Sequence, residues 1–158
     1  MKFGNGCWLQ KEGCECFAPQ QVYFVKTEPK KVTLCAPTAR INHRGDTLGG
    51  IVLTIEITSP MPEVIRVKTS HHLGVQKKGP DLNIEENMDL NVTEDEEKIR
   101  IESGSLALII TKEYWSMTYE RNGEVITKSS GRDLAFMKTD WNGFAYDKGG
   151  ADAYMRQE

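Results

Sequence analysis

The sequence predicts an all-β protein built as an antiparallel β-sandwich. From Trp115 to Glu120, apolar and polar side chains alternate with a period of two, which a strand satisfies and a helix does not. Asn122-Gly123 follows and tolerates the positive φ angles of a two-residue type I′ turn, so a partner strand is expected to return as far as Thr127. Leu106 to Ile110 is apolar on both faces, which predicts a second layer packed over this hairpin.

The first part of the chain is predicted to hold one hairpin. Met1 to Ala18 shows no periodicity and is expected to be irregular. Val22 to Val25 and Val32 to Ala36 have the composition of short strands, and Glu28 to Lys31 is a polar, turn-like link between them. Thr38 to Gly50 is rich in turn residues and is expected to form a loop.

A second antiparallel pair is predicted next. Ile51 to Ser59 alternates strictly, and its apolar face consists of Ile51, Leu53, Ile55 and Ile57. Pro60 ends this strand because proline has no N–H to donate to the ladder. Val64 to Ser70 is the expected partner, with Ile65 and Val67 facing inward.

The second half of the chain continues the β pattern, which gives eight or nine short strands in all. His71 to Leu82 is predicted to be a long polar loop, and Met88 to Val92 and Lys98 to Ser103 are predicted strands. The acidic run from Thr93 to Glu97 between them is more typical of a solvated turn than of a calcium site, because its carboxylates are consecutive. After Ser129 the sequence is rich in glycine and aromatic residues, and no strand is assigned there.

Length and charge limit the classes of protein. A chain of 158 residues is expected to form one domain, residues 1–158. Its 20 Lys and Arg against 23 Asp and Glu give a net charge of −3, without a basic stripe, so neither nucleic acid nor a membrane is an expected partner. No apolar window reaches the roughly 20 residues of a membrane span, and no signal peptide opens the chain. We therefore expect a cytoplasmic protein.

The four cysteines do not have the spacing of a metal site. Cys14-x-Cys16 differs from the C-x₂-C spacing of zinc modules, and no histidines follow at ligand spacing. A disulfide framework with Cys7 and Cys35 is the alternative, but free, partly buried thiols are expected in the absence of a secretory signal. We expect no metal and no cofactor.

Two polar motifs are candidates for function. Asn42-His-Arg-Gly-Asp46 gathers an imidazole, a guanidinium and a carboxylate, as a recognition loop would, but a turn in which Asp46 accepts backbone N–H bonds is favoured. His71-His72 suggests a proton shuttle, but adjacent residues on a strand point to opposite faces, which favours a structural or solvent-facing role. The sequence contains no nucleophile elbow, phosphate loop or metalloprotease motif.

The aromatic residues fall into two groups. Trp115 and Tyr119 share a strand face and could stack on a sugar ring, but their hydrophobic alternation favours the core. Trp141, Phe144 and Tyr146 lie in a Gly-rich segment, where burial is harder, so they are candidates for contact with a ligand or a second domain. Trp141 and Tyr146 are the candidate substrate-binding residues.

Several segments occur together in an order that resembles a known family. They are Gly6-Cys-Trp8-Leu9 with Gly13, Gln21-Val-Tyr-Phe-Val25, Leu53-Thr-Ile-Glu-Ile-Thr-Ser-Pro60, Ser70-His-His-Leu-Gly74 with Gly79-Pro80, and Tyr114-Trp-Ser with Glu120-Arg-Asn-Gly-Glu. Each motif alone is weak, and their order and spacing carry the match. Over nearly the whole chain they resemble the start of glycoside hydrolase family 31, specifically its bacterial α-xylosidase branch.

The resemblance implies a galactose-mutarotase-like β-sandwich placed before a catalytic (β/α)₈ barrel. In the family, two aspartates on the barrel carry out retaining hydrolysis of α-glycosidic bonds. A barrel takes roughly 250 residues, and no position of this chain matches a catalytic residue. The expected role is that of a non-catalytic N-terminal domain, truncated at its C-terminal end, which packs on the barrel of the same polypeptide and helps shape its pocket for α-linked oligosaccharides.

Truncation would leave an exposed sheet edge, so self-association into a homo-oligomer is also expected. Two other functions stay open. One is an autonomous carbohydrate-binding module that uses Trp141 and Tyr146. The other is a mutarotase, which needs convergent His and Glu groups and is disfavoured by the separated histidines.

Overall fold

The part of the chain that the structure describes folds into three antiparallel β-sheets. The computed structural model describes residues 10, 12–71, 87–129, 133–139 and 152–157. The four-stranded sheet has the order β2-β3-β4-β5 and consists of β2 (Phe24–Glu28), β3 (Lys31–Pro37), β4 (Val52–Thr58) and β5 (Arg66–Ser70). The five-stranded sheet has the order β10-β9-β8-β7-β6 and consists of β6 (Asn91–Glu94), β7 (Lys98–Ser103), β8 (Leu106–Thr111), β9 (Ser116–Arg121) and β10 (Glu124–Ser129).

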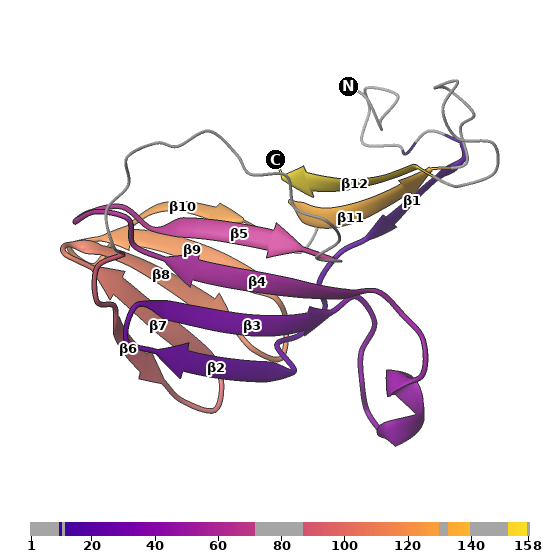
Figure 1. Ribbon diagram of the computed structural model, residues 1–158, viewed down its shortest axis with the longest axis horizontal. Helices are drawn as coiled ribbons and strands as arrows, with labels where there is room; N and C mark the ends of the chain where they lie inside the picture. Colours follow the sequence, from indigo (N-terminus) through magenta and orange to yellow (C-terminus); the bar gives the residue numbers. More distant parts are fainter. Residues whose placement is uncertain (1–9, 11, 72–86, 130–132, 140–151, 158) are drawn as a thin grey trace.

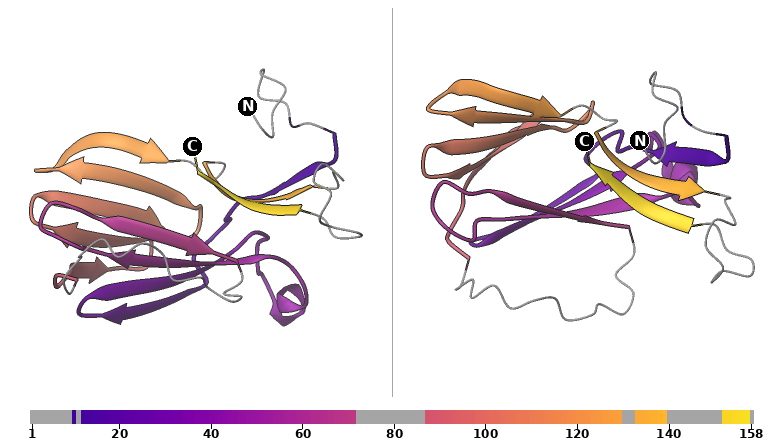
Figure 2. Two further views of the ribbon diagram at one scale, coloured as in Figure 1. Left: turned by 45° about the horizontal axis from the view of Figure 1, so that its top comes forward. Right: turned by 90° about the horizontal axis from the view of Figure 1, so that it is seen from above.

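The two larger sheets pack face to face, as the right-hand view in Figure 2 shows. One cluster of buried apolar side chains lies between them, drawn from β3 and β4 on one side and from β7, β8 and β9 on the other. Its fully buried members include Val32, Leu34, Leu53, Ile55, Ile57, Ile99, Ile101, Leu108 and Ile110. The predicted antiparallel β-sandwich is therefore confirmed.

The predicted alternation of β9 is confirmed. Trp115, just before this strand, is 6% exposed, Met117 is 1% exposed, and Tyr119 packs partly against the core. The apolar β8 is covered differently on its two faces. Leu108 and its inward neighbours face the other sheet, whereas Ala107 lies on the outer face and is 2% exposed. Long polar side chains of the neighbouring strands lie over that face, as described below.

Two tight turns set the register of the five-stranded sheet. Asn122 and Gly123 have φ angles of 51° and 82°, which is the type I′ geometry predicted from this dipeptide. Gly104, in the turn between β7 and β8, has φ of 62°, a conformation that L side chains rarely adopt. The ladder between β9 and β10 is interrupted between Val125 and Thr127, so Ile126 forms a bulge in the outermost strand.

A polar latch joins the ends of the two sheets. Glu63, between β4 and β5, accepts hydrogen bonds from the backbone N–H of Ser105 (2.6 Å) and from its hydroxyl group (2.5 Å). Beside it, the buried hydroxyls of Ser59 and Ser103 lie 2.7 Å apart, and Ser59 also donates to the carbonyl of Met61. The β4–β5 connection is thus fastened to the β7–β8 turn.

The third sheet has the order β1-β11-β12, with β1 (Cys14–Phe17), β11 (Leu134–Thr139) and β12 (Asp152–Gln157). It extends to one side of the sandwich (Figure 1). The expectation that Met1 to Ala18 is wholly irregular is wrong for Cys14–Phe17, and the absence of predicted strands after Ser129 is wrong as well. The described residues hold twelve strands rather than eight or nine.

The other predicted strands are confirmed with shifts of a few residues at their ends. The loop predicted from His71 to Leu82 lies outside the described residues, apart from His71. The strand expected at Val22 begins at Phe24, and the strand expected at Met88 begins at Asn91, while Met88 itself forms an isolated bridge with Ser59. No helix in the described part of the chain is long and apolar enough to cross a membrane.

Candidate functional site

The predicted aromatic site residues Trp141 and Tyr146, with Phe144, lie outside the described residues, so that assignment stays a prediction. Trp115 and Tyr119 belong to the core and do not form a sugar platform, as their alternation indicated. Burial raises the pKa of the Tyr119 phenol.

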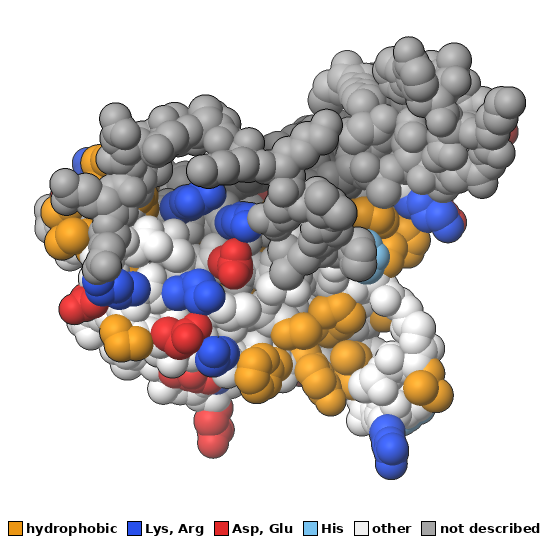
Figure 3. Space-filling model, viewed as in Figure 1, with side chains coloured by type: hydrophobic (Ala, Val, Ile, Leu, Met, Phe, Trp, Pro, Cys, Tyr) orange, Lys and Arg blue, Asp and Glu red, His pale blue; other side chains and the backbone are white. Residues whose placement is uncertain are grey.

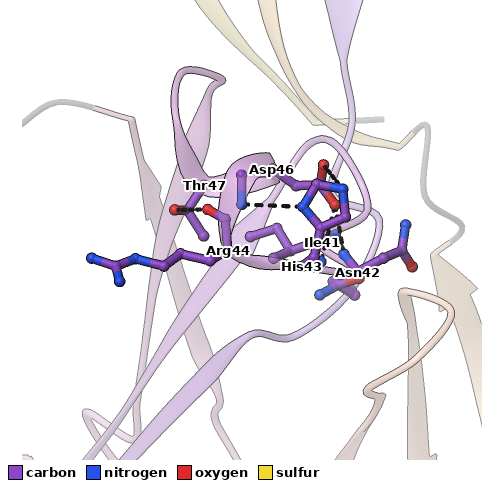
Figure 4. Close-up of polar contacts among 8 residues, drawn as sticks. Ile41, Asn42, His43, Arg44, Asp46 and Thr47 are labelled. Atoms are coloured by element: carbon purple, nitrogen blue, oxygen red, sulfur yellow. Dashed lines mark hydrogen bonds and ion pairs between the residues drawn. The ribbon is translucent and has the colours of Figure 1, made fainter.

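The Asn42–Asp46 motif is a hydrogen-bonded turn, as predicted (Figure 4). Asp46 Oδ2 accepts from the backbone N–H groups of Asn42 (2.9 Å) and His43 (3.2 Å). His43 Nδ1 accepts from the N–H of Gly45 at 3.1 Å, and the short 3₁₀ helix η1 (Arg44–Thr47) follows. The carboxylate and the imidazole therefore hold the loop in shape.

His71 has a structural environment. Its Nδ1 lies 3.1 Å from the carbonyl oxygen of Val52, and its ring centroid lies 4.7 Å from that of Phe136. His72 lies outside the described residues. His71 thus helps to join β4 to the third sheet, in agreement with the structural interpretation.

A different group of residues meets where the two large sheets come together. The segment Gln20–Tyr23 forms backbone hydrogen bonds to both sides. Toward the end of β3, the N–H of Gln20 donates to Pro37 O (2.9 Å) and the N–H of Tyr23 to Cys35 O (2.9 Å). Toward the turn between β8 and β9, the N–H of Val22 donates to Lys112 O at 2.7 Å. Chain segments far apart in the sequence therefore meet at one end of the sandwich.

Three exposed side chains form the centre of this region, which we call the Tyr114 corner: Arg40, Glu113 and Tyr114. The guanidinium carbon of Arg40 lies 4.6 Å from the centroid of the Tyr114 ring. Arg40 Nη2 also donates to Glu113 Oε1 at 3.0 Å. Hydrogen bonds to Tyr114 and Glu113 raise the pKa of Arg40 further above its ordinary value, so its charge is fixed.

Apolar side chains gather beside the corner. Figure 3 shows hydrophobic side chains over the end of the four-stranded sheet where β2 begins and β3 ends. Tyr23 and Phe24, at the start of β2, are 55% and 57% exposed. The rest of this sheet face is charged and carries ion pairs among Lys26, Glu28, Lys31, Glu56 and Lys68. The apolar end of the face is therefore distinct from its polar remainder.

The outer face of the five-stranded sheet carries the side chains that cover Ala107. Arg100 forms ion pairs of 2.7 Å with both Glu102 and Glu120, which lie on the strands either side of β8. The hydrogen bond from Arg100 lowers the pKa of Glu102, and a second one comes from Asn91. A general acid in glycoside hydrolysis requires a raised pKa, so this network has the chemistry of a structural cluster.

The described residues contain no group of three or more His, Cys, Asp or Glu side chains that could hold a metal ion. Cys14 and Cys35 are partly buried free thiols, as expected, and Cys7 lies outside the described residues. Burial raises the pKa of the Cys35 thiol, which makes this thiol less reactive. In the acidic run, Asp95 accepts from the N–H groups of Glu97 and Lys98 at 2.8 Å, which confirms a turn there. The first two residues of the predicted turn, Thr93 and Glu94, belong to β6 instead.

The fold defines the class of protein: an antiparallel β-sandwich of the galactose-mutarotase-like kind. Residues 54–157 match the model of the glycosyl hydrolase 31 N-terminal galactose mutarotase-like domain. The chain belongs to this family.

Two curated α-xylosidases are similar in sequence. The α-xylosidase XylQ of Lactiplantibacillus pentosus is 33% identical over 145 residues, a match that covers 90% of this chain and 18% of XylQ. An α-xylosidase of Emericella nidulans is 34% identical over 80 residues, which cover 51% of this chain and 10% of that protein. The chain thus spans less than a fifth of the length of these relatives.

A solved structure is similar in fold. The cycloalternan-forming enzyme of Listeria monocytogenes, solved with a pentasaccharide substrate, superposes with a TM-score of 0.57 at 14% identity. The similarity covers 78% of this chain and 11% of the enzyme. At this identity it supports the fold.

Proposed function

We propose that this chain is a non-catalytic N-terminal domain of a retaining α-glycosidase of the α-xylosidase type. The observation that carries the proposal is the match to XylQ over 90% of the chain but only 18% of XylQ, together with the family-31 domain model. Chemistry on α-xylosides or related α-glycosides then belongs to a (β/α)₈ barrel in the same polypeptide, on which the sandwich packs and whose pocket it helps to shape.

The ionisation of the described carboxylates supports this division of labour. The carboxyl pKa values that are shifted in the described part of the chain, those of Glu63, Asp95 and Glu102, are all lowered by hydrogen bonds. A retaining glycosidase needs a carboxylic acid that is still protonated near neutral pH, beside an ionised nucleophile about 5 Å away. None of these three carboxyls has that property.

The first test is hydrolysis of p-nitrophenyl α-xyloside by the purified 158-residue chain, with XylQ as the positive control. Turnover is expected from XylQ only. Turnover by the chain that co-elutes with it through a second purification would mean that a catalytic carboxylate pair lies within these residues and that the proposal is wrong.

The second test asks whether the chain can support a catalytic domain. In a chimera, the 145 matched residues of this chain replace the corresponding segment of XylQ. XylQ without that segment is expected to be inactive, and the chimera is expected to regain turnover. A chimera that is soluble and folded but as inactive as the deletion variant would contradict a packing role on the barrel.

A further inference from the structure

The Tyr114 ring presents one open face. Its side chain is 68% exposed although the Arg40 guanidinium lies 4.6 Å from the ring centroid on one side. The opposite ring face is therefore the part in contact with solvent. An aromatic face left open on a β-sandwich offers a stacking surface for a flat apolar partner.

The backbone on both sides of the ring is fixed in place. The Thr111 hydroxyl donates to the carbonyl of Tyr114, and the N–H of Trp115 donates to Gln20 O at 3.2 Å. Trp115 itself is anchored in the core at 6% exposure. The ring thus stands on a rigid base, which reduces the entropy that a ligand would lose on ordering it.

Hydrogen-bonding groups lie beside the ring. The ion pair of 3.0 Å joins one guanidinium nitrogen of Arg40 to one carboxylate oxygen of Glu113. A guanidinium carries five N–H donors and a carboxylate accepts at two oxygens, so both keep capacity for further hydrogen bonds. Their side chains are 37% and 70% exposed, so this capacity faces the solvent. The backbone next to Arg40 is also fixed, because the N–H of Ile41 donates to Gln21 Oε1 at 3.3 Å.

The charge of the corner selects against ionic ligands. Glu113 already neutralises the charge of Arg40, so an anion such as a phosphate at the remaining N–H donors would be repelled by the nearby carboxylate. A pyranose ring has the complementary chemistry, with an apolar C–H face for the aromatic ring and hydroxyl groups at its rim for the guanidinium and the carboxylate.

We infer that the Tyr114 corner is a binding surface for the ring of a neutral glycoside, stacked on the open face of Tyr114 and hydrogen-bonded by Arg40 and Glu113. That the glycoside is an α-xyloside or α-glucoside rests on the proposed function.

The inference is tested by ¹⁵N NMR titration of the 158-residue chain with methyl α-D-xylopyranoside and methyl α-D-glucopyranoside. Saturable shifts are expected at the amides of Ile41 and of residues 113–115. Tyr114→Ala should abolish these shifts, and Tyr114→Phe, which keeps the ring, should retain them. Leu48→Ala is the matched control, because Leu48 is the most exposed apolar side chain described, at 85%, and lies outside the corner.

Three results would overturn the inference. One is the absence of shifts with either glycoside. Another is the same shifts with inorganic phosphate at lower concentration, which would identify an anion site. The third is full retention of the shifts in Tyr114→Ala, which would place the sugar elsewhere, for example at Trp141.

The XylQ chimera separates this inference from the proposed function. Loss of turnover of p-nitrophenyl α-xyloside in a chimera that carries Tyr114→Ala, with unaltered glycoside shifts in the isolated variant chain, would assign the corner to domain packing and reject it as a sugar site. An inactive chimera would count against the proposed function alone, because the titration does not depend on the barrel.

Discussion

Gly104 and Glu63 show how closely two single residues are fitted to each other. Gly104 has a φ of 62°, and a Cβ added there would lie 1.9 Å from Glu63 Oε1 and 2.7 Å from Glu63 Cδ. Glu63 itself has a φ of 63°, unusual for a residue with a side chain, and its carboxylate is held by Ser105. The latch between the two sheets thus depends on a glycine at this position.

Gly104→Ala is therefore expected to destabilise the fold on two counts. The left-handed backbone costs roughly 1–2 kcal/mol for an L residue, and displacement of the Glu63 carboxylate adds to this. Gly123→Ala is the matched control, since Gly123 has a φ of 82° but no atom within 4 Å of the added Cβ. Chemical denaturation of both variants measures the difference, and an equal loss in the two would show that the contact with Glu63 contributes nothing.

The latch also predicts a pH dependence. Hydrogen bonds from the Ser105 hydroxyl and then the Ser105 N–H lower the pKa of Glu63 below its ordinary value of 4.5. Because the folded-state pKa is the lower one, the stabilisation is complete above pH 4.5 and is lost as the pH falls through the folded-state value.

Glu63→Gln is expected to be less stable than the parent chain near neutral pH and to lose less stability in acid. The measurement is the free energy of unfolding as a function of pH. Ser105→Ala should reduce the acid sensitivity in part, since the hydroxyl is the largest cause of the shift. An unchanged pH profile in both variants would show that the latch does not form in solution.

At the scale of elements, both faces of the apolar strand β8 are covered, one by the second sheet and the other by polar side chains from the neighbouring strands. The sequence indicates an apolar strand on both faces, and the structure covers one face with the second sheet and the other with the Arg100 network above Ala107. A small residue at position 107 leaves room for the guanidinium to reach across to Glu120, on the far side of β8.

Arg100→Ala is expected to lower the free energy of unfolding by about 1–2 kcal/mol, because it removes two charge-assisted hydrogen bonds and leaves Glu102 and Glu120 without a common partner. Lys26→Ala is the control, since its ion pair with Glu28 is more exposed and should contribute about 0–1 kcal/mol. Urea titrations compare the two. A loss no larger than that of the control would reduce the network to ordinary surface charges.

The elements that sequence reasoning missed share a physical cause. β1 is only four residues long, and β11 is buried on both faces at Leu134, Ala135 and Met137, so neither shows the alternation that identifies a strand. Their pairing with each other, Cys14 to Thr139, spans most of the chain, and no local pattern encodes it. By contrast, the β9–β10 hairpin was predictable because its turn chemistry and its register are both local.

The same distinction applies to the candidate site. The turn at Asp46 was predictable because all its partners lie within four residues. The Tyr114 corner was not, because Arg40 and Glu113 are 73 residues apart and meet only once the two sheets have packed. Its one local signal is Tyr114, an aromatic residue that directly precedes the alternating pattern beginning at Trp115 and is therefore not assigned to the buried face of the strand.

At the scale of the whole molecule, the segment Gln20–Tyr23 joins the two large sheets along one margin of the sandwich. It is bonded to Pro37 and Cys35 on one side and to Lys112 on the other, and Leu90 adds a bond to Pro29 along the same margin. At the opposite margin, where β5 and β10 end the sheets, the described residues form no backbone hydrogen bond from one sheet to the other.

A sandwich joined in this way should open first at the margin formed by β5 and β10. In native-state hydrogen exchange, the amides of β5 should therefore exchange with deuterium sooner than those of β2, although both are outer strands of the same sheet. The reverse order would mean that the margin at Gln20–Tyr23 is the weaker one. The expected order implies that the two sheets separate transiently on the side away from the Tyr114 corner. The surface assigned to the sugar then stays rigid while the far margin moves.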